Sequence, residues 1–112
     1  MQGINYKYNN KKTYIAGEKF DSKKESARFM ELCMLQRSGV ISDLRRQVRF
    51  EIVPKNGNER AAYYVADFVY KKADGKMIIE DVKSPMTKRL PLYVLKRKLV
   101  KYQYPEYIFI ET

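Results

Sequence analysis

The chain contains no histidine and only one cysteine, Cys33. These two shortages exclude an intrachain disulfide and a zinc cluster built from cysteine and histidine. They also exclude the Ser-His and Cys-His pairs that activate many nucleophiles. A lone cysteine is typical of an intracellular protein. Any catalysis must therefore use carboxylates, lysines and a metal ion.

Acidic residues and long apolar runs are also scarce. The chain has 13 Asp and Glu against 23 Lys and Arg, for a formal net charge of +10. No apolar run approaches the length of a transmembrane helix, and the polar residues after Met1 predict no signal peptide. This excess of positive charge favours a polyanionic partner, and nucleic acid rather than a membrane.

The length of 112 residues predicts one domain, spanning residues 1–112, with a small core. Hydrophobic residues make up 45% of the chain, which argues against disorder. Residues 1–12 are polar and basic, and we expect them to form a flexible arm. A small hairpin is predicted from Thr13–Ile15 and Glu18–Phe20, which flank an Ala-Gly pair.

A second hairpin organises the middle of the chain. Its two strands are predicted around a tight turn at Ala73-Asp74-Gly75, a sequence flanked by alternating apolar residues. Side chains alternate faces along a strand, so Asp81 and Lys83 share one face, roughly 6–7 Å apart, and Glu80 takes the other. With the register centred on Gly75, Asp67 lies close to Asp81. Two carboxylates and a lysine then project together from an apolar ribbon.

This arrangement suits a divalent metal ion. Mg²⁺ prefers hard oxygen ligands and usually takes only one or two protein carboxylates, which Asp67 and Asp81 would supply. Lys83 beside the ion could orient an attacking water or offset negative charge in a phosphodiester transition state. The alternative is a surface hairpin that carries its charges on the solvent face.

An amphipathic helix is predicted from residue 22 to about residue 38. Ser22 as N-cap and Glu25 three residues later form a capping box. At 100° per residue, Glu25 falls on the inward apolar stripe, whereas Glu31 falls on the solvent side. The residues alone leave two roles open for Glu25, as a helix cap or as a third carboxylate of the site.

The charged residues of the hairpin resemble the motif of the PD-(D/E)xK nuclease superfamily. Here the motif reads as Asp67, thirteen intervening residues, and Asp81-Val82-Lys83, with Ala66 where a proline often precedes the first aspartate. In Holliday-junction-resolvase-like members an early helix supplies a glutamate, so the resemblance assigns Glu25 to the metal site. It implies a restriction-endonuclease-like core and catalytic roles for these four residues.

The segments FDSKKESARFMEL, ISDL, YVADF and EDVKS are similar to a family of small phage or prophage proteins within that superfamily. This second resemblance covers most of the chain. Together the two imply Mg²⁺ as cofactor, with Mn²⁺ able to substitute, and DNA as substrate, branched DNA included. They also imply the cytoplasm of a bacterial host as the site of action.

A strand is predicted at Gln47–Val53, after a link at Val40–Leu44, because apolar and charged residues alternate there. Related proteins often carry a glutamine at the position of Gln47. We expect it to cap the backbone in preference to contacting the site. The strands of the central hairpin are predicted at Arg60–Lys71 and Lys76–Lys83.

The segment from Lys83 to Lys101 has seven basic residues and no acid. Pro91 suits the first turn of a helix predicted to end near Tyr102. Its apolar stripe is predicted to consist of Leu92, Leu95, Leu99 and Tyr102. A solvated helix face is the alternative, but one-signed charge favours a phosphate-binding surface. The residues expected to bind DNA are Lys88, Arg89, Lys96, Arg97, Lys98 and Lys101.

The predicted order is helix, three antiparallel strands, helix and strand, which gives an α/β or α+β fold with a mixed central β-sheet flanked by helices. The last strand, Tyr107–Glu111, is expected beside the strand that carries Asp81. The function favoured by this sequence is a Mg²⁺-dependent endonuclease. A DNA-binding module without cleavage, an RNA-directed enzyme or RNA-binding module, and a structural phage protein remain as alternatives, and a homodimer is left open.

Overall fold

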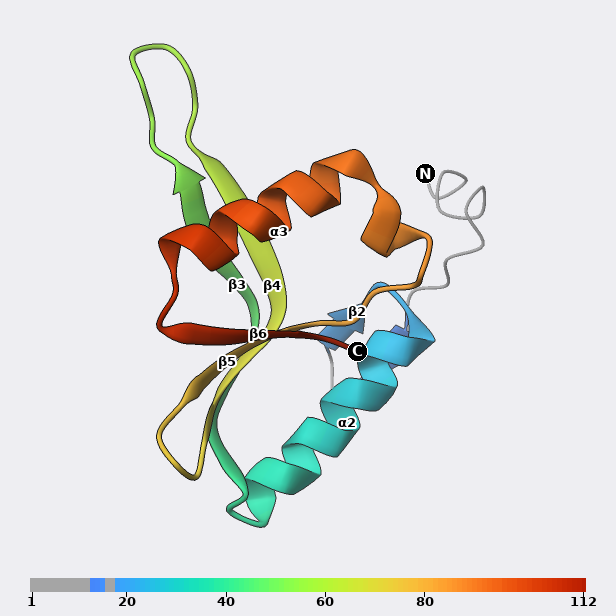
Figure 1. The fold of residues 1–112 in the computed structure, drawn as a ribbon. Coiled ribbons are helices and arrows are strands. Elements are labelled where there is room, and N and C mark those ends of the chain that lie inside the picture. The colour runs from blue at the N-terminus through green and yellow to red at the C-terminus, as the bar shows by residue number, and fades with distance from the viewer. Residues whose placement is uncertain (1–12, 16–17) are drawn as a thin grey trace.

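The computed structural model describes residues 13–15 and 18–112. The predicted flexible arm at residues 1–12 and the turn at residues 16 and 17 lie outside this part of the chain. The elements are β1 (Thr13–Ile15), β2 (Glu18–Phe20), α2 (Lys23–Arg37), β3 (Ile41–Val53), β4 (Ala62–Lys72), β5 (Met77–Asp81), a short 3₁₀ turn (Thr87–Arg89), α3 (Pro91–Gln103) and β6 (Tyr107–Glu111) (Figure 1).

In the described part of the chain, β1 pairs with β2 and four further strands form one sheet in the order β3-β4-β5-β6. The pairs β3–β4 and β4–β5 are antiparallel, whereas β5–β6 is parallel, with α3 as the connection. The predicted α+β class, the order of elements and the mixed sheet with its helices are confirmed. No helix among the described residues is long and apolar enough to cross a membrane.

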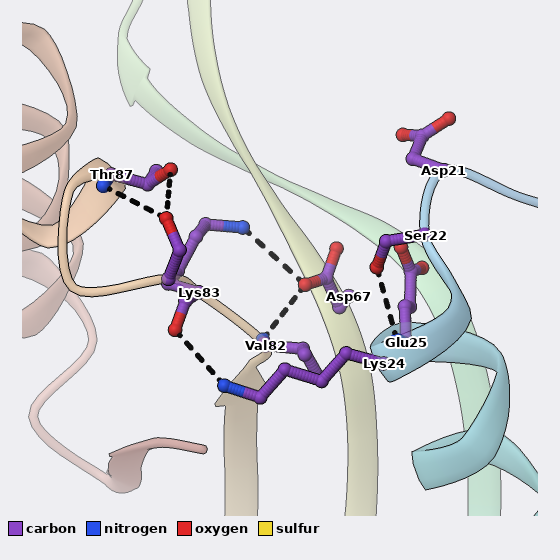
Figure 2. Close-up of a pocket in the computed structure, with 9 residues that line it drawn as sticks. Asp21, Ser22, Lys24, Glu25, Asp67, Val82, Lys83 and Thr87 are labelled. Carbon is purple, nitrogen blue, oxygen red and sulfur yellow. Dashed lines mark hydrogen bonds and ion pairs between the residues drawn. The ribbon is translucent and has the colours of Figure 1, made fainter. Parts of the chain in front are cut away.

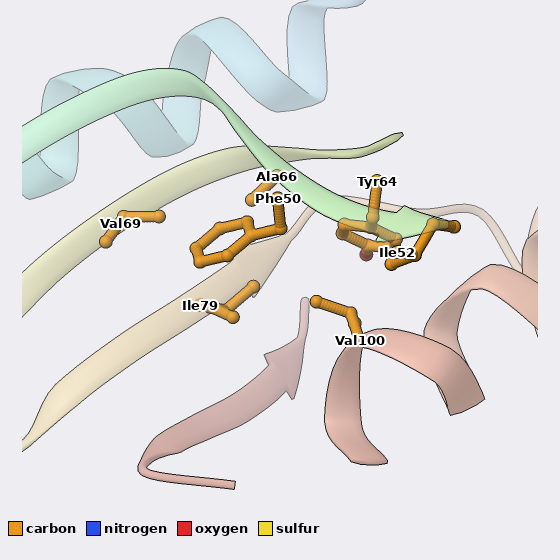
Figure 3. Close-up of a cluster of buried hydrophobic side chains, with 7 residues drawn as sticks. All are labelled: Phe50, Ile52, Tyr64, Ala66, Val69, Ile79 and Val100. Carbon is orange, nitrogen blue, oxygen red and sulfur yellow. The ribbon is translucent and has the colours of Figure 1, made fainter. Parts of the chain in front are cut away.

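Two hydrophobic clusters hold the helices to the sheet. One packs Val100 of α3 against sheet residues that include Phe50, Tyr64 and Ile79 (Figure 3). The other packs Leu32 of α2 against sheet residues that include Phe68. Burying side chains of this size contributes about 1.5–3 kcal/mol each, so both helices are anchored mainly by apolar contacts.

At one point along the β3–β4 ribbon, the face that packs beneath α3 becomes the face that packs beneath α2. Ala66 belongs to the cluster beneath α3, but Phe68 belongs to the cluster beneath α2, although residues two apart share a face in a regular strand. On β3, Gln47 has a left-handed φ of 52°. The register pairs Val48 with Ala66, so Gln47 lies opposite Asp67. Asp67, between Ala66 and Phe68, therefore lies at the junction of the two hydrophobic clusters.

The predicted start of β3 was wrong, because the strand begins at Ile41 and not at Gln47. Asp43 and Gln47 both have positive φ, and the pairing with β4 is irregular between Ser42 and Arg45. These irregularities break the alternation of apolar and polar residues. The first half of the strand therefore reads as a link in the sequence.

The predicted apolar stripe of α3 was also largely wrong. Leu92, Leu95 and Tyr102 are 64%, 55% and 83% exposed, whereas Val100 is fully buried and Leu99 is half-buried. Tyr93 and Leu99 pack against the cluster of Val100. The helix is thus rotated so that an aromatic ring and a valine, in place of the leucine row, cover the sheet.

Candidate functional site

The candidate site forms where the β4–β5 ladder ends. The last backbone pair is Phe68 with Glu80, so the next positions along the two strands are Asp67 and Asp81. There the backbone N–H of Asp67 donates to Asp81 Oδ1 (3.0 Å), and the N–H of Val82 donates to Asp67 Oδ2 (2.9 Å). Two side-chain carboxylates thus accept the hydrogen bonds of strands that are beginning to separate.

Lys83 contacts both carboxylates. Its Nζ lies 3.3 Å from Asp67 Oδ2 and 3.6 Å from Asp81 Oδ1 (Figure 2 shows the contact with Asp67). The predicted convergence of Asp67, Asp81 and Lys83 is confirmed. The predicted strand end was wrong by two residues, because β5 stops at Asp81 and Lys83 extends from the segment after it.

Glu25 serves the helix cap with its backbone and the site with its side chain. Its N–H donates to Ser22 Oγ (3.1 Å), as the capping box predicts. Its carboxylate is buried, accepts a hydrogen bond from Gln47 Nε2 (3.1 Å) and lies 3.5 Å from Arg46 Nη2. Glu31 is exposed and pairs with Arg28, as expected for the solvent side.

Gln47 belongs to the site, although its place at the start of a predicted strand favoured a backbone cap. Its Nε2 donates to Glu25 Oε2 and also lies 3.4 Å from Asp67 Oδ1, so it bridges the helix and strand carboxylates. The expectation that it caps the backbone was wrong. Its location opposite Asp67 depends on the irregular register of β3, and no local sequence pattern predicts that register.

Glu80 is fully buried next to Asp81 but takes no part in this cluster. It accepts hydrogen bonds from Arg28 Nε (2.5 Å), Tyr70 Oη (2.6 Å) and Thr112 Oγ1 (3.0 Å). The prediction that Glu80 faces away from Asp81 and Lys83 is thereby confirmed. A buried carboxylate with this many donors is satisfied and holds α2 to the end of β5.

The electrostatics of the cluster are those of crowded, buried charges. Burial raises the pKa of Asp81, and the nearby Lys83 only partly offsets this. Burial and the charge of Asp67 raise the pKa of Glu25. For Lys83, burial lowers the pKa, but the charges of Asp81 and Asp67 outweigh it and the net pKa is raised. Lys83 therefore stays protonated at neutral pH and is unsuited to act as a base.

The donor atoms fit a metal ion held by two carboxylates. Asp81 Oδ2 is buried and has no hydrogen-bond partner among the residues that the structure describes. A hard anionic oxygen of this kind is a ligand that Mg²⁺ prefers, and Mg²⁺ needs only one or two from the protein. In the described ranges no group of three or more Asp, Glu, Cys or His residues is arranged to hold a metal. Glu25 is connected to Asp67 through the amide of Gln47.

A pocket of about 320 Å³ opens beside the cluster (Figure 2). Its walls combine the start of α2, including Lys24 and Glu25, with Asp67, Lys83 and Thr87. Lys24 Nζ donates to the carbonyl of Lys83 (3.3 Å), which ties the helix start to the segment after β5. Two lysines next to carboxylates give the pocket the mixed charge that a metal and a phosphate group would require together.

The predicted DNA-binding residues differ in their surroundings. Arg89, Lys98 and Lys101 are exposed, and Lys88 and Lys96 are partly buried. Arg97 was predicted on the solvent side of α3, but its side chain is only 25% exposed and pairs with Glu111 (3.5 Å). Of the four basic residues of α3, Lys98 and Lys101 are therefore the exposed ones.

The chain matches a known protein family over most of its length. The model of the family described as "Protein of unknown function (DUF1064)" matches residues 5–110. The chain belongs to the DUF1064 family. No curated protein and no solved structure shows significant similarity to this DUF1064 chain.

Proposed function

We propose that this DUF1064 protein is a Mg²⁺-dependent endonuclease of the PD-(D/E)xK type that cuts DNA, branched DNA included. The observation that carries the proposal is the convergence of Asp67, Asp81 and Lys83 at the end of the β4–β5 ladder. Glu25 joins them from a separate helix through Gln47. Two crowded carboxylates beside a protonated lysine are poorly explained by stability alone, because burying them is costly.

Each residue has a distinct role in this proposal. Asp67 and Asp81 would hold Mg²⁺ or Mn²⁺, an ion that would polarise the phosphate and activate a water. Lys83 keeps its proton and stabilises the negative charge that develops on the phosphate. Gln47 orients the carboxylates of Asp67 and Glu25 by donating to both.

The charge of the chain supports DNA as the partner. The net charge is +10, and Lys88, Arg89, Lys98 and Lys101 follow the site along the chain. Such residues neutralise phosphates without reading sequence. The resemblance to phage proteins supports action in the cytoplasm of a bacterial host.

The decisive experiment measures cleavage of supercoiled plasmid and of synthetic four-way junctions in Mg²⁺, Mn²⁺ and EDTA. We expect metal-dependent cuts by the wild type and none by Asp81→Asn. Matched RNA junctions identify the sugar that is accepted. A protein that cuts none of these substrates in either metal, or equally well with Asp81→Asn, would overturn the proposal.

A second candidate is a nucleic-acid-binding module without catalysis. It is favoured by Lys83, whose ammonium already pairs with both Asp67 and Asp81, and by the lack of a three-ligand group in the described ranges. The two candidates differ in metal binding. An ion that binds only the folded state raises its stability, by about 2.7 kcal/mol at 100 times the dissociation constant. A melting temperature unchanged by Mg²⁺ and Mn²⁺ would favour the module.

A further inference from the structure

A second pocket, with a different character, borders Asp81 and Lys83. It has a volume of about 330 Å³ and is walled by Tyr63, Tyr64, Val65, Leu92, Tyr93 and Lys96. Asp81 and Lys83 also line it. The pocket therefore joins the proposed metal site to an aromatic and aliphatic wall between β4 and the start of α3.

This wall is suited to a ligand with flat apolar faces. Val65 and Leu92 are 45% and 64% exposed, so apolar surface faces solvent directly beside a cluster of charges. Tyr64 is buried, and its hydroxyl has no hydrogen-bond partner within the described part of the chain. A pocket near the lower end of the usual 300–1,000 Å³ range accepts one small ring system. A nucleobase combines apolar faces with a polar edge.

The pocket continues into a basic surface along the β3–β4 ribbon. Tyr63 also lines a neighbouring pocket of about 540 Å³, whose other walls include Arg49, Lys55 and Arg60 together with one acid, Glu51. The guanidinium of Arg49 lies 4.0 Å from the centre of the Tyr63 ring. Positive charge interleaved with aromatic rings is the usual surface for a single nucleic-acid strand.

The order of these features along β4 matches the course of one strand. From Asp67 to Tyr63 the strand covers about 13 Å, at roughly 3.3 Å per residue. In a duplex the base faces are hidden in the stack, and only base edges are accessible in the grooves. The apolar pocket is therefore useful only to a base that is unpaired.

We propose that a single strand of DNA runs from the Asp67–Asp81–Lys83 cluster along β4. One unpaired base occupies the pocket between Tyr63 and Leu92, and the following phosphates lie on Arg49 and Arg60. We call this route the single-strand path. As the route of a substrate it rests on the proposed nuclease function, and it narrows that substrate to DNA with an unpaired strand next to the cut.

The binding test is made in EDTA, where no cleavage occurs, by fluorescence anisotropy with a labelled single-stranded oligonucleotide and a duplex of the same sequence. Removing an aromatic ring that stacks on a base weakens binding roughly tenfold. We expect this loss for Tyr63→Ala on the single strand and little change on the duplex. Tyr102→Ala is the matched control, because Tyr102 is 83% exposed and lies outside the residues that wall the two pockets.

Two further pairs of variants control for misfolding and for a simple loss of positive charge. Leu92→Ala is compared with Leu95→Ala, since both leucines are exposed on α3 and only Leu92 lines the pocket. A double variant, Arg49→Ala with Arg60→Ala, is compared with a second double variant, Arg37→Ala with Arg45→Ala. The second removes the same net charge outside the path. We expect several-fold weaker single-strand binding for the path variants than for their controls.

Equal effects of the path variants and their controls would overturn the single-strand path, as would equal affinity of the wild type for single strand and duplex. Neither result would bear on metal-dependent cleavage. Conversely, a wild type that binds single strands through Tyr63 and cuts no DNA would overturn the nuclease and retain the path as a binding site.

Discussion

The backbone N–H of Asp67 donates to Asp81 Oδ1 over 3.0 Å, which joins the two proposed metal ligands directly. The carboxylate of Asp67 in turn accepts a hydrogen bond from the N–H of Val82, the residue after Asp81. Each aspartate thus helps to position the other, and both end the β4–β5 ladder. A substitution that keeps a side-chain oxygen preserves this geometry, whereas alanine would leave buried N–H groups without partners.

Asp81→Asn is expected to abolish Mg²⁺-dependent cleavage and to leave DNA binding nearly unchanged. The amide oxygen can still accept from Asp67, but the anionic oxygen that suits a metal is lost. The rise in melting temperature that Mg²⁺ gives the wild type should also disappear. Plasmid nicking and thermal unfolding with and without Mg²⁺ measure both effects. An Asp81→Asn protein that still cuts would assign the metal to another residue.

The stability of the metal-free protein should depend on pH through Asp81. Burial raises the pKa of Asp81 above its unfolded value, which is about 3.9. A raised pKa in the folded state stabilises the protein fully below the unfolded pKa, and this contribution is lost as the pH rises through the folded pKa. Each unit of difference corresponds to about 1.4 kcal/mol.

Urea unfolding of wild type and Asp81→Asn in EDTA, from pH 4 to pH 7, isolates this contribution. The free energy of unfolding of Asp81→Asn, taken relative to the wild type, should increase with pH. A relative stability that stays constant would mean that Lys83 compensates the buried charge in full, and one that decreases would mean that the pKa of Asp81 is lowered in the folded state.

Glu25→Gln is expected to lower the cleavage rate at least tenfold without lowering stability much. The substitution keeps the backbone N–H that donates to Ser22, so the helix cap remains. It removes the charge beside Gln47 and Asp67. Ser22→Ala should do the opposite, with a loss of about 1 kcal/mol in stability and cleavage retained per folded molecule. Glu31→Gln is the control, and it should match the wild type in both measurements.

Gln47→Asn separates the bridging side chain from the backbone that carries it. Asparagine tolerates the positive φ of Gln47 better than most residues, but it is one methylene too short to reach both Glu25 and Asp67. We expect an unchanged or slightly higher melting temperature and a cleavage rate lowered roughly tenfold. Asp43→Asn, at the other positive-φ residue of β3, should leave the rate unchanged. A Gln47→Asn protein with the wild-type rate would show that the bridge is dispensable.

The central hairpin could be predicted because its signals are local. The turn at Ala73-Asp74-Gly75 fixes the register, and Gly75 indeed has a positive φ of 88°. That register is sufficient to bring Asp67 to Asp81. Gln47 could not be assigned in this way, because its contacts depend on the change of face between Ala66 and Phe68, opposite which Gln47 itself has a positive φ.

The orientation of α3 was missed for a different reason. Tyr93, Arg97, Val100 and Tyr104 also recur at helical spacing, but an arginine within that row makes it look less apolar than the leucine row. In the structure Arg97 pairs with Glu111, and Tyr93 donates to the same carboxylate. A charge on an inward stripe is tolerated because its partner lies on β6, which the sequence of α3 alone does not show.

The last prediction concerns the outer side of α3. DNA binding through phosphates releases counterions, so the logarithm of affinity falls linearly with the logarithm of salt concentration, by about 0.9 for each phosphate contact on a duplex. Arg97 is paired with Glu111 and Lys96 is partly buried, so the exposed basic residues of this helix are Lys98 and Lys101. Replacing both with alanine should flatten the slope by up to about two and weaken binding to all sequences alike.

The control replaces Arg37 and Arg45, which reduces the net charge by the same amount at the far end of α2 and on β3. It should change the slope much less, because general charge acts weakly beyond the Debye length of about 8–10 Å. Asp81→Asn should retain the full slope, since it adds no phosphate contact and removes none. If the two double substitutions flatten the slope equally, α3 does not face the DNA, and its lysines serve only the overall charge.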